Sequence, residues 1–533
     1  MSMPSVEIIS RRIDADVDAM RLFQACESIS DKDYRLLLES SEQGSNGKQQ
    51  SILFLESALV IKATGQDVSF NARNENGQQA LAIMQNYMQE MHGFEVIAAS
   101  DRAMTLSYPD TRSIISEDER IKRLTSLDAV RQCLASLSAG QTHDAHKLMV
   151  AGVVGYDYVN VLETLPEIEG SDNDFPDVLM LLADSQIVLD KQARRLEIRQ
   201  LIFAGERADK IKAQARGRIS AIEQIVASDL ATETRDVSRQ HEVDFDSINI
   251  HPDRETFKEQ IQVLKNGIDE GRIFQCVIGR QFQVPCDDPE VAYQILAQQN
   301  PSPYQFYLRM GQYTLFGASP ESSLRYDSKA RTISIMPIAG TRGRGRNPDG
   351  SINLEIDARL EADLKLDEKE LAEHLMLVDL ARNDLARIAT TGSRHVSELM
   401  AIYRYASVMH MVSRVDAELK NELDIFHACQ ACFHMGTLSG APKTEAMSLI
   451  SEVEQRPRGV YGGAVGYFTA AGDMDSAIII RSALVENDIA TVSAGAGIVY
   501  DSIPDMEVRE TELKASSVLR AIQTANEEGA EHD

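Results

Sequence analysis

The feature of this chain that most constrains its fold is a helical pattern that combines apolar residues with acids. In residues 370–380 the apolar side chains recur at helical spacing, at Leu371, Leu375, Leu377, Val378 and Leu380. Such a stripe predicts a helix packed against a core, with Glu373 at the edge of the buried face. A carboxylate in that position must be paired with a cation, protonated or bound to a metal.

A second acidic helix is predicted near the end of the sequence. Ser502 and Pro504 mark its start, and Glu507, Glu510 and Lys514 then fall at i, i+3 and i+7 on one face. Two such helices could hold one hard cation between their carboxylates. Oxygen ligands from few side chains suit Mg²⁺, which keeps several waters and completes its shell with anionic oxygens of a substrate.

Length and composition limit the kind of protein. A chain of 533 residues is too long for one ordinary core, and roughly two or three domains or one large composite fold are expected. The 43% hydrophobic and 26% charged content is typical of a soluble globular protein. The longest apolar run, Val178–Ala183, is too short to span a bilayer, and the N-terminus lacks the pattern of a secretory signal. We therefore expect no membrane segment and a cytoplasmic location.

The net charge of -28 argues against binding to nucleic acids or anionic membranes. An anionic substrate would need local capture, for which Arg481, Lys514 and Lys443 are the candidate cations beside glycines or acids. The six cysteines are sparse, which indicates reduced thiols rather than disulfides. Cys429 and Cys432 form a CxxC string, but without a second pair of ligands a structural role is favoured over a metal site.

The order of patterns along the chain predicts an α+β protein. Alternating residues in 51–62 and 195–203 indicate half-buried antiparallel strands, and further strands are predicted at 313–316, 332–336, 463–468 and 477–485, between long helices. Residues 227–247 are polar and unpatterned, so we predict a linker there between an N-terminal region (1–226) and a second domain (248–525). Neither a GxGxxG string after a strand nor a GxxxxGK[ST] loop is found, which disfavours nucleotide chemistry.

Five short strings follow one another in the second half of the sequence. They are Phe316–Ser322 (FGASPES), Pro337–Arg342 (PIAGTR), Glu373–Asp384 (EHLMLVDLARND), Gly436–Lys443 (GTLSGAPK) and Gly495–Asp501 (GAGIVYD). Together and in this order they resemble the chorismate-utilising enzymes, and more narrowly component I of anthranilate synthase. The likeness continues in the N-terminal half at Leu36–Ser40, Gly155–Asp157 and Phe175–Asp177. The resemblance implies large, mostly antiparallel sheets flanked by helices.

The resemblance also implies a reaction and a metal. In that family ammonia adds to chorismate, a ring hydroxyl leaves and pyruvate is eliminated to give anthranilate, a lyase reaction that Mg²⁺ assists. The metal-binding glutamates of the family match Glu373 and Glu510, which the helical patterns had already indicated. The metal would bind the ring carboxylate and stabilise charge as the hydroxyl departs. The alternative for these acids is a solvated helix face.

Several small residues match positions that contact the substrate in the family. They are Gly340, Thr341, Gly495, Ala496 and Gly497, with Tyr461, Arg481 and Lys514 as polar and charged partners. Backbone N–H groups approach a small dianion only where no side chain intrudes, and a guanidinium binds a carboxylate with two hydrogen bonds. The alternatives are ordinary turn chemistry for the glycines and an i,i+4 ion pair with Glu510 for Lys514.

Four further residues are candidates for a role in catalysis. His410 matches the histidine near the ring elimination, although a buried structural histidine is the alternative. Glu321 matches the proposed general acid for the departing hydroxyl, a role for which burial must raise its pKa. Thr437 would contact the substrate or bond within its own turn. Gln275 occupies the position where water-adding relatives carry a lysine base, which glutamine cannot replace.

The choice of nucleophile separates members of the family. Aminodeoxychorismate synthases, the alternative assignment within the family, resemble this chain but carry a lysine nucleophile where Ala339 stands here. Ala339 and Gln275 together favour ammonia as the nucleophile and anthranilate as the product.

Regulation and a partner are implied as well. Glu39, Ser40, Pro303, Tyr304 and Gln305 match the two halves of the family's site for the feedback inhibitor L-tryptophan. None of the cysteines has the glycine-flanked setting of a glutaminase nucleophile. A hetero-oligomer with a separate glutamine amidotransferase subunit, component II, is therefore expected. A tryptophan-binding regulator without catalysis is the alternative from another functional class, and it would be expected to have lost at least one of the catalytic residues.

Overall fold

The computed structural model describes residues 5–41, 49–113, 116–140, 144–168, 175–228, 243–405 and 408–532. Of the predicted linker at 227–247, residues 229–242 lie outside the described ranges. Among the described helices, none is both long and apolar enough to cross a membrane.

A first antiparallel sheet contains strands from both halves of the chain. In hydrogen-bonded order its strands are β1 (Val6–Asp14), β9 (Arg195–Phe203), β8 (Val178–Asp190), β3 (Gln49–Thr64), β2 (Tyr34–Ser41), β12 (Tyr304–Met310), β13 (Tyr313–Ser319), β22 (Ser482–Glu486), β23 (Ile489–Ile498), β11 (Gln275–Pro285) and β10 (Asn249–His251). The halves meet at β2 and β12, where Ser40 is paired with Tyr304. Segments on either side of the polar stretch therefore share one sheet.

A second antiparallel sheet branches from β8. It continues through β7 (Met149–Val154), β20 (Ala464–Thr469), β21 (Met474–Ile478), β14 (Ser322–Asp327), β15 (Thr332–Ile335) and β18 (Val408–Glu418), with β16 (Ile338–Gly343) and β17 (His395–Arg404) also paired to β18. Four short strands extend the sheets, β4 (Asp67–Ala72), β6 (Ala103–Ser107) and β5 (Glu95–Ala99) beyond β3, and β19 (Gly440–Ala441) beside β11.

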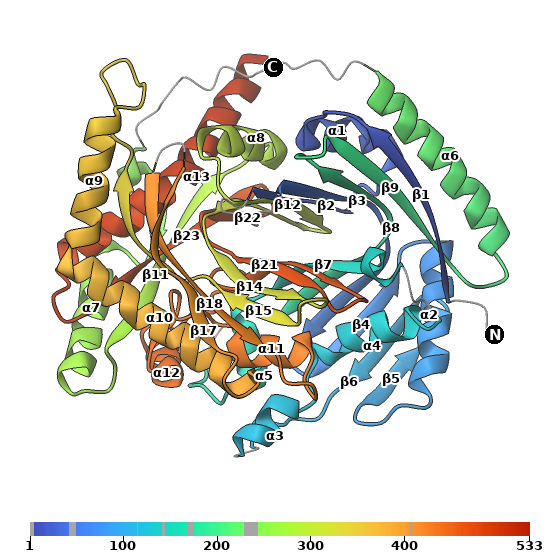
Figure 1. Cartoon of the computed structure of the whole chain (residues 1–533), viewed down its shortest axis with the longest axis horizontal. Helices are drawn as coiled ribbons and strands as arrows, with labels where there is room; N and C mark the ends of the chain where they lie inside the picture. Colours follow the sequence, from blue (N-terminus) through green and yellow to red (C-terminus); the bar gives the residue numbers. More distant parts are fainter. Residues whose placement is uncertain are drawn as a thin grey trace.

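The two sheets are stacked with helices on their outer faces (Figure 1). Apolar side chains such as Leu36, Phe54, Phe306 and Val465 fill the space between them. On the first sheet and its extension pack α1 (Ala19–Ala25), α2 (Glu75–Met88), α6 (Ala208–Ala227), α8 (Pro289–Gln299) and α13 (Pro504–His532); on the second pack α4 (Asp128–Leu137), α10 (Glu368–Ile388) and α11 (Ile425–Cys432). The remaining helices are α3 (Glu117–Lys122), α5 (Val159–Leu162), α7 (Arg254–Asp269), α9 (Leu354–Leu366) and α12 (Lys443–Glu454). The predicted α+β class with antiparallel sheets flanked by helices is confirmed.

The chain crosses between the sheets at two adjacent points. Pro320 and Glu321 connect β13 to β14, and residues 479–481 connect β21 to β22. The first crossover lies against the end of β21, where the N–H of Ile478 donates to the carbonyl of Glu321 at 3.0 Å. The single strand predicted at 477–485 is therefore wrong. Arg481 breaks it by adopting a left-handed conformation with φ of 50°.

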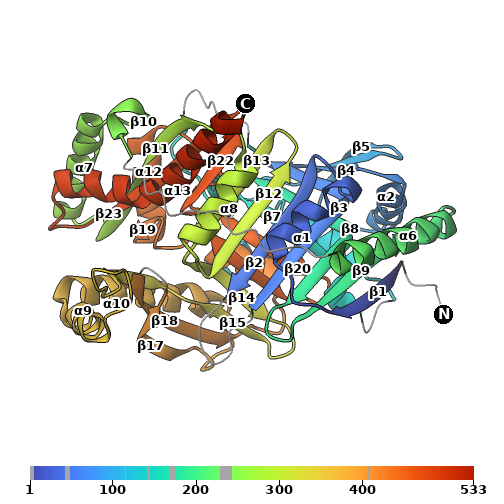
Figure 2. The same cartoon turned by 90° about the horizontal axis from the view of Figure 1, so that it is seen from above.

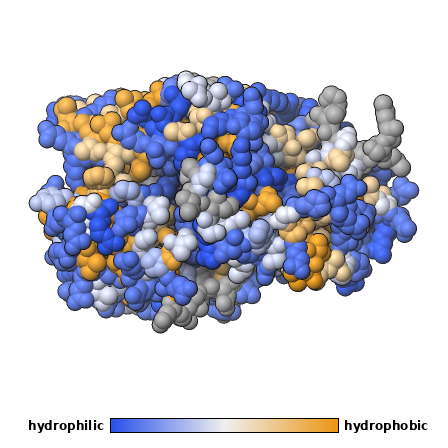
Figure 3. Space-filling view, turned by 90° about the horizontal axis from the view of Figure 1, so that it is seen from below, coloured by the Kyte–Doolittle hydropathy of each residue, from blue (hydrophilic) through white to orange (hydrophobic). Residues whose placement is uncertain are grey.

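The other strand predictions hold with small shifts at their ends. Residues 51–62 lie within β3, and β9 spans 195–203 as predicted. Hydrophilic residues cover most of the face shown in Figure 3, with hydrophobic patches scattered among them, as the charged composition leads one to expect.

Both predicted acidic helices are present, but one residue of the predicted apolar stripe faces solvent. α13 begins at Pro504 as predicted. α10 begins after Asp367, whose side chain accepts from the N–H groups of Lys369 and Glu370. Its core face holds residues such as His374 and Leu377, whereas Leu375 is 47% exposed. The predicted apolar stripe was wrong at Leu375, because the core-facing row continues to Ala381, Leu385 and Ile388 rather than through position 375.

Candidate active site

A cavity of about 550 Å³ lies between the two acidic helices and is large enough for a small-molecule substrate. α10, β16 and β18 supply one side, and β11, β23 and α13 supply the other. Figure 2 shows these two groups of elements one below the other at the left of the molecule. Both crossovers between the sheets also contribute, through Pro320 and Glu321 and through Ile480 and Arg481.

The cavity gathers nearly all the catalytic, substrate and metal residues predicted from the sequence. Its lining includes Gln275, Glu321, Gly340, Thr341, Glu373, His410, Thr437, Tyr461, Arg481, Gly495, Gly497, Glu510 and Lys514. Ala496 and Lys443 are the exceptions, and Lys443 instead pairs with the buried Asp384 at 2.7 Å. Successive side chains of a strand point to opposite faces, so Ala496 packs with Ile278 and Val508 in a core cluster and does not line the cavity.

Four carboxylates face the cavity from the two helices. Glu370 and Glu373 project from α10, and Glu507 and Glu510 project from α13. Burial is the largest cause that raises the pKa of Glu373, and the charges of Glu370 and Glu510 raise it further. Burial and Glu510 likewise raise the pKa of Glu507. The sequence analysis assigned no role to Glu370, although the i, i+3 spacing from Glu373 was a signal for a shared helix face.

Two of these carboxylates have cationic partners. Arg342 donates to Glu370 at 2.9 Å and to Asp367 at 2.8 Å, which ties β16 to the start of α10. Lys514 pairs with Glu510 at 2.7 Å and also donates to the carbonyl of Gly495 at 2.9 Å. The i,i+4 ion pair of Lys514 is thus present, and its ammonium also faces the cavity.

Glu373 lacks a direct partner for its carboxylate among the described residues. Within the described part of the chain its carboxylate makes neither a hydrogen bond nor an ion pair, and the charges of Glu370 and Glu510 raise its pKa more than those of Lys514 and Lys369 lower it. No group of three or more histidines, cysteines or acids among the described residues has the geometry of a metal site. Mg²⁺ is often held by only one or two carboxylates, with water and substrate completing the shell. A divalent cation between Glu373 and Glu510 would offset the repulsion between the acids, so the residues present fit the group.

Glu321 is a carboxyl group that stays protonated at neutral pH. Its side chain is buried at the first crossover, and desolvation raises its pKa to about 8, although Thr437, the Ile338 backbone and Lys514 act in the opposite direction. A protonated carboxylic acid inside a substrate-sized cavity can donate a proton to a leaving hydroxyl.

His410 is a neutral imidazole in the same cavity. Its Nδ1 lies 2.9 Å from the hydroxyl of Thr341 on the neighbouring strand. Burial, and secondly the charge of Arg481, lowers its pKa to about 4. Above that pH the ring is able to accept a proton.

The wall formed by β11 and β23 is closely packed at two glycines. A Cβ at Gly495 would lie 2.6 Å from the hydroxyl oxygen of Tyr461, and one at Gly497 would lie 2.8 Å from Nε2 of Gln275. The Oε1 atom of Gln275 is buried and has no hydrogen-bond partner among the residues that the structure describes, as expected for a group that meets a ligand.

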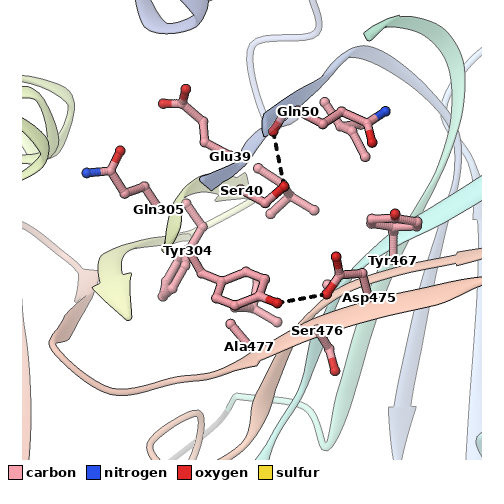
Figure 4. A pocket seen from close by; sticks show the side chains of 14 residues that line it. Glu39, Ser40, Gln50, Tyr304, Gln305, Tyr467, Asp475, Ser476 and Ala477 are labelled. Carbon is pink, nitrogen blue, oxygen red and sulfur yellow. Dashed lines mark hydrogen bonds between the residues drawn. The ribbon is translucent and has the colours of Figure 1, made fainter. Parts of the chain in front are cut away.

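Four of the five predicted inhibitor residues, all except Pro303, line a second, smaller cavity between the two sheets (Figure 4). Ser40 and Tyr304 face it from the first sheet, and Tyr467, Asp475 and Ala477 face it from the second. The Tyr304 hydroxyl donates to Asp475 at 3.1 Å. The cavity has a volume of about 30 Å³, room for a few water molecules.

The other predicted inhibitor residues have different contacts. Gln305 donates to the carbonyl of Ala297 at 3.1 Å, and Glu39 accepts from the hydroxyl of Ser51 at 3.0 Å. Both line the small cavity, but Figure 4 shows their side chains directed away from Ser40. Pro303 precedes β12 and does not line this cavity.

Comparison with known proteins gives a consistent family. A family model described as chorismate binding enzyme matches residues 50–520. The anthranilate synthase component 1 of Escherichia coli (strain K12) is 45% identical over 496 residues, which is 93% of each chain. That of Salmonella typhimurium is 42% identical over 528 residues, which is 98% of each chain.

Solved structures agree with this result. Anthranilate synthase component I from Streptococcus pneumoniae TIGR4 has a TM-score of 0.64 and 28% identity, covering 90% of this chain and 93% of that chain. The menaquinone-specific isochorismate synthase from Escherichia coli has a TM-score of 0.65 at 17% identity, covering 97% and 95%, which shows a shared fold. The chain therefore belongs to the chorismate binding enzymes and, among them, to the anthranilate synthase component 1 family.

Proposed function

We propose that this protein converts chorismate and ammonia to anthranilate and pyruvate. The observation that carries the proposal is one cavity that holds the acids Glu373 and Glu510, the protonated Glu321 and the cation Arg481. The names of its relatives support the same reaction. The chain would act as the component of a lyase that binds chorismate in tryptophan biosynthesis.

Chorismate carries two carboxylates, and the cavity offers cations on two sides. Arg481 and Lys514 would bind one or both of these carboxylates directly, with Tyr461 and the backbone of Gly495 and Gly497 beside them. Glu373 and Glu510 would hold Mg²⁺, which supplies Lewis-acid stabilisation of negative charge on the substrate. Through the bound cation, Glu373 and Glu510 would thus help to bind an anionic substrate although they are themselves negatively charged.

Proton transfer would use Glu321 and His410. Glu321 gives its proton to the ring hydroxyl, which leaves as water when ammonia adds to the ring. A ring proton and the enolpyruvyl group then leave, giving anthranilate and pyruvate, and neutral His410 is placed to assist this elimination while Thr341 orients its imidazole. Ala339 and Gln275 line the same cavity. The side chain of Ala339 has no amine that could act as the nucleophile, and the amide of Gln275 cannot act as a base that activates water. Both residues favour ammonia as the nucleophile.

Ammonia would come from a glutamine amidotransferase subunit, and L-tryptophan would inhibit by binding between the sheets. The small cavity at Ser40 is too small for an indole ring in its present form. Binding would require the sheets to separate locally, and a ligand that favours one arrangement of the sheets can change activity at a distance.

The direct test is to mix the purified chain with chorismate, Mg²⁺ and ammonium, and to follow anthranilate fluorescence. The chain contains no tryptophan, so its own fluorescence background is low. Anthranilate formation supports the proposal. If the product is 4-amino-4-deoxychorismate or isochorismate, the assignment from Ala339 and Gln275 is overturned, and unchanged chorismate would favour a regulator that binds without catalysis.

Removal of either proposed metal ligand should abolish most of the activity. We expect Glu373→Gln and Glu510→Gln to lower kcat/KM by at least about 100-fold, because Lewis-acid stabilisation contributes several kcal/mol. Mg²⁺ titrations of anthranilate formation measure the effect. The matched control is Glu368→Gln on an exposed position of α10 outside the cavity, which should behave like the wild type. Equal Mg²⁺ dependence in E373Q and wild type would exclude Glu373 as a ligand.

The turnover rate should fall as pH rises through about 8, because the general acid Glu321 must be protonated and its pKa is raised to about 8. The neutral form of His410 is retained above about pH 4, so this group sets no limit near neutrality. Rates should be compared at saturating chorismate and equal concentrations of free NH3. Glu321→Gln should lower kcat by about 100-fold or more and remove the decline near pH 8. A variant that keeps the same decline would show that another group causes it.

Filling the small cavity should separate inhibition from catalysis. Ser40→Leu places a branched side chain between Tyr304 and the second sheet, so anthranilate formation should persist while inhibition by L-tryptophan weakens by about 10-fold or more, a loss of about 1.4 kcal/mol in binding. Ser10→Leu, at an exposed position of β1, is the control for a leucine on a strand surface. Unchanged inhibition in S40L would place the inhibitor elsewhere.

A further inference from the structure

His374 is a buried histidine that follows the proposed metal ligand Glu373 in the sequence and takes no part in the proposed proton transfers. His374 is fully buried on α10 and does not line the cavity. Its Nδ1 lies 3.2 Å from the carbonyl oxygen of Ala339, and its Nε2 lies 2.6 Å from the hydroxyl of Ser413. It therefore joins the helix of Glu373 to two strands of the second sheet, β16 and β18.

The contact with Ala339 is made where β16 leaves its regular pairing. The register between β16 and β18 shifts between Ile338 and Thr341, and Gly340 has a φ of 89°. A bulge of this kind leaves backbone groups outside the ladder, and a buried carbonyl needs another donor. Because a carbonyl only accepts, the proton of the neutral imidazole is on Nδ1, and His374 supplies that donor.

The contact with Ser413 links His374 to a second register shift, which lies in the pairing of β18 with β17. The register between β17 and β18 shifts between Glu398 and Ala401, and Met400 is left-handed with φ of 54°. The N–H of Met400 donates to the Ser413 hydroxyl oxygen at 2.9 Å. That hydroxyl can in turn donate its proton to Nε2 of His374. One imidazole thus satisfies the unpaired groups of two bulges, one directly and one through Ser413.

We propose that His374 is a positioning residue for the substrate, acting through the Ala339 carbonyl. Ala339, Gly340 and Thr341 form part of the cavity wall, and Thr341 bonds to His410. The hydrogen bond to Ala339 fixes the bulge that directs Gly340 and Thr341 toward the substrate, and it links this wall to the helix that carries Glu373. The proposal rests on the proposed conversion of chorismate.

Two substitutions separate the contacts of the imidazole. The terminal amide of asparagine occupies the place of Nδ1, so His374→Asn keeps a donor for Ala339 and loses the contact with Ser413. The longer amide of glutamine occupies the place of Nε2, so His374→Gln keeps the Ser413 contact and loses the donor for Ala339. Each variant replaces the ring by an uncharged amide at the same buried position, and each is therefore the control for the other.

Steady-state kinetics with chorismate, Mg²⁺ and ammonium should distinguish the two variants. We expect H374N to keep a KM for chorismate within about threefold of the wild type, and H374Q to raise it by about 10-fold or more with a smaller effect on kcat, in the range found for partners that orient active-site ligands. Equal KM values for the two variants, or a wild-type KM in H374Q, would overturn the proposal. If H374Q does not fold, the double variant H374N/S413A decides, since it should keep the KM of H374N.

Hydrogen exchange of the backbone amides gives a readout that needs no substrate. Amides of residues 340–342 should exchange faster in H374Q than in H374N or the wild type, whereas Ser413→Ala should affect mainly the Met400 amide. Equal protection of 340–342 in H374N and H374Q contradicts the positioning role. If the wild type makes no anthranilate, the proposed reaction fails, and the exchange data still decide whether His374 fixes the bulge.

Discussion

The fold depends on the pairing of two long neighbouring strands, β3 and β8, from which both sheets extend. Their pairing spans Gln50 to Ala63 and brings N-terminal and C-terminal strands into the same layers. Once both sheets are fixed, the chain must pass from one to the other. A backbone segment between sheets cannot continue either ladder, so its polar groups need other partners. The carbonyl of Glu321 accepts from Ile478 at the end of β21, Ile479 bonds to Gly462 and Gly463, and the carbonyl of Arg481 accepts from Ala318. Both crossovers also border the cavity.

Electrostatics explains how an acidic chain can hold an anionic substrate. The four carboxylates of α10 and α13 come from two sequence segments more than a hundred residues apart, and the fold brings them to one cavity. Cations partly balance two of them, Arg342 at Glu370 and Lys514 at Glu510. Glu373 is left with raised pKa and like-charged neighbours. Local charge, not the net charge of -28, therefore determines what this site can bind.

Sequence patterns predicted the elements well where one physical signal dominated. The alternation of apolar and polar side chains predicted β9, and Pro504 predicted the start of α13. The patterns failed where the same apolar signal continued from a strand into a connecting segment. The apolar run continues through Ile479 and Ile480 although β21 ends at Ile478, and the break that contains the left-handed Arg481 is not encoded by any hydrophobic pattern.

The site itself was predictable largely through motifs, whose residues indeed share one cavity. What the motifs could not supply was the environment of each group. The raised pKa of Glu321 requires knowledge of its burial, and the exclusion of Ala496 requires the direction of its strand. The bulges joined by His374 depend on strand register, which is set by pairing over the whole sheet.

The crossovers also place the two cavities within a few residues of each other along the chain. Tyr304 and Ala477 line the small cavity, and they pair with Ser319 and Ser322, which flank Pro320 and Glu321. Glu321, the acid of the large cavity, thus lies on the four-residue segment Ser319–Ser322, whose two ends are paired with opposite walls of the small cavity.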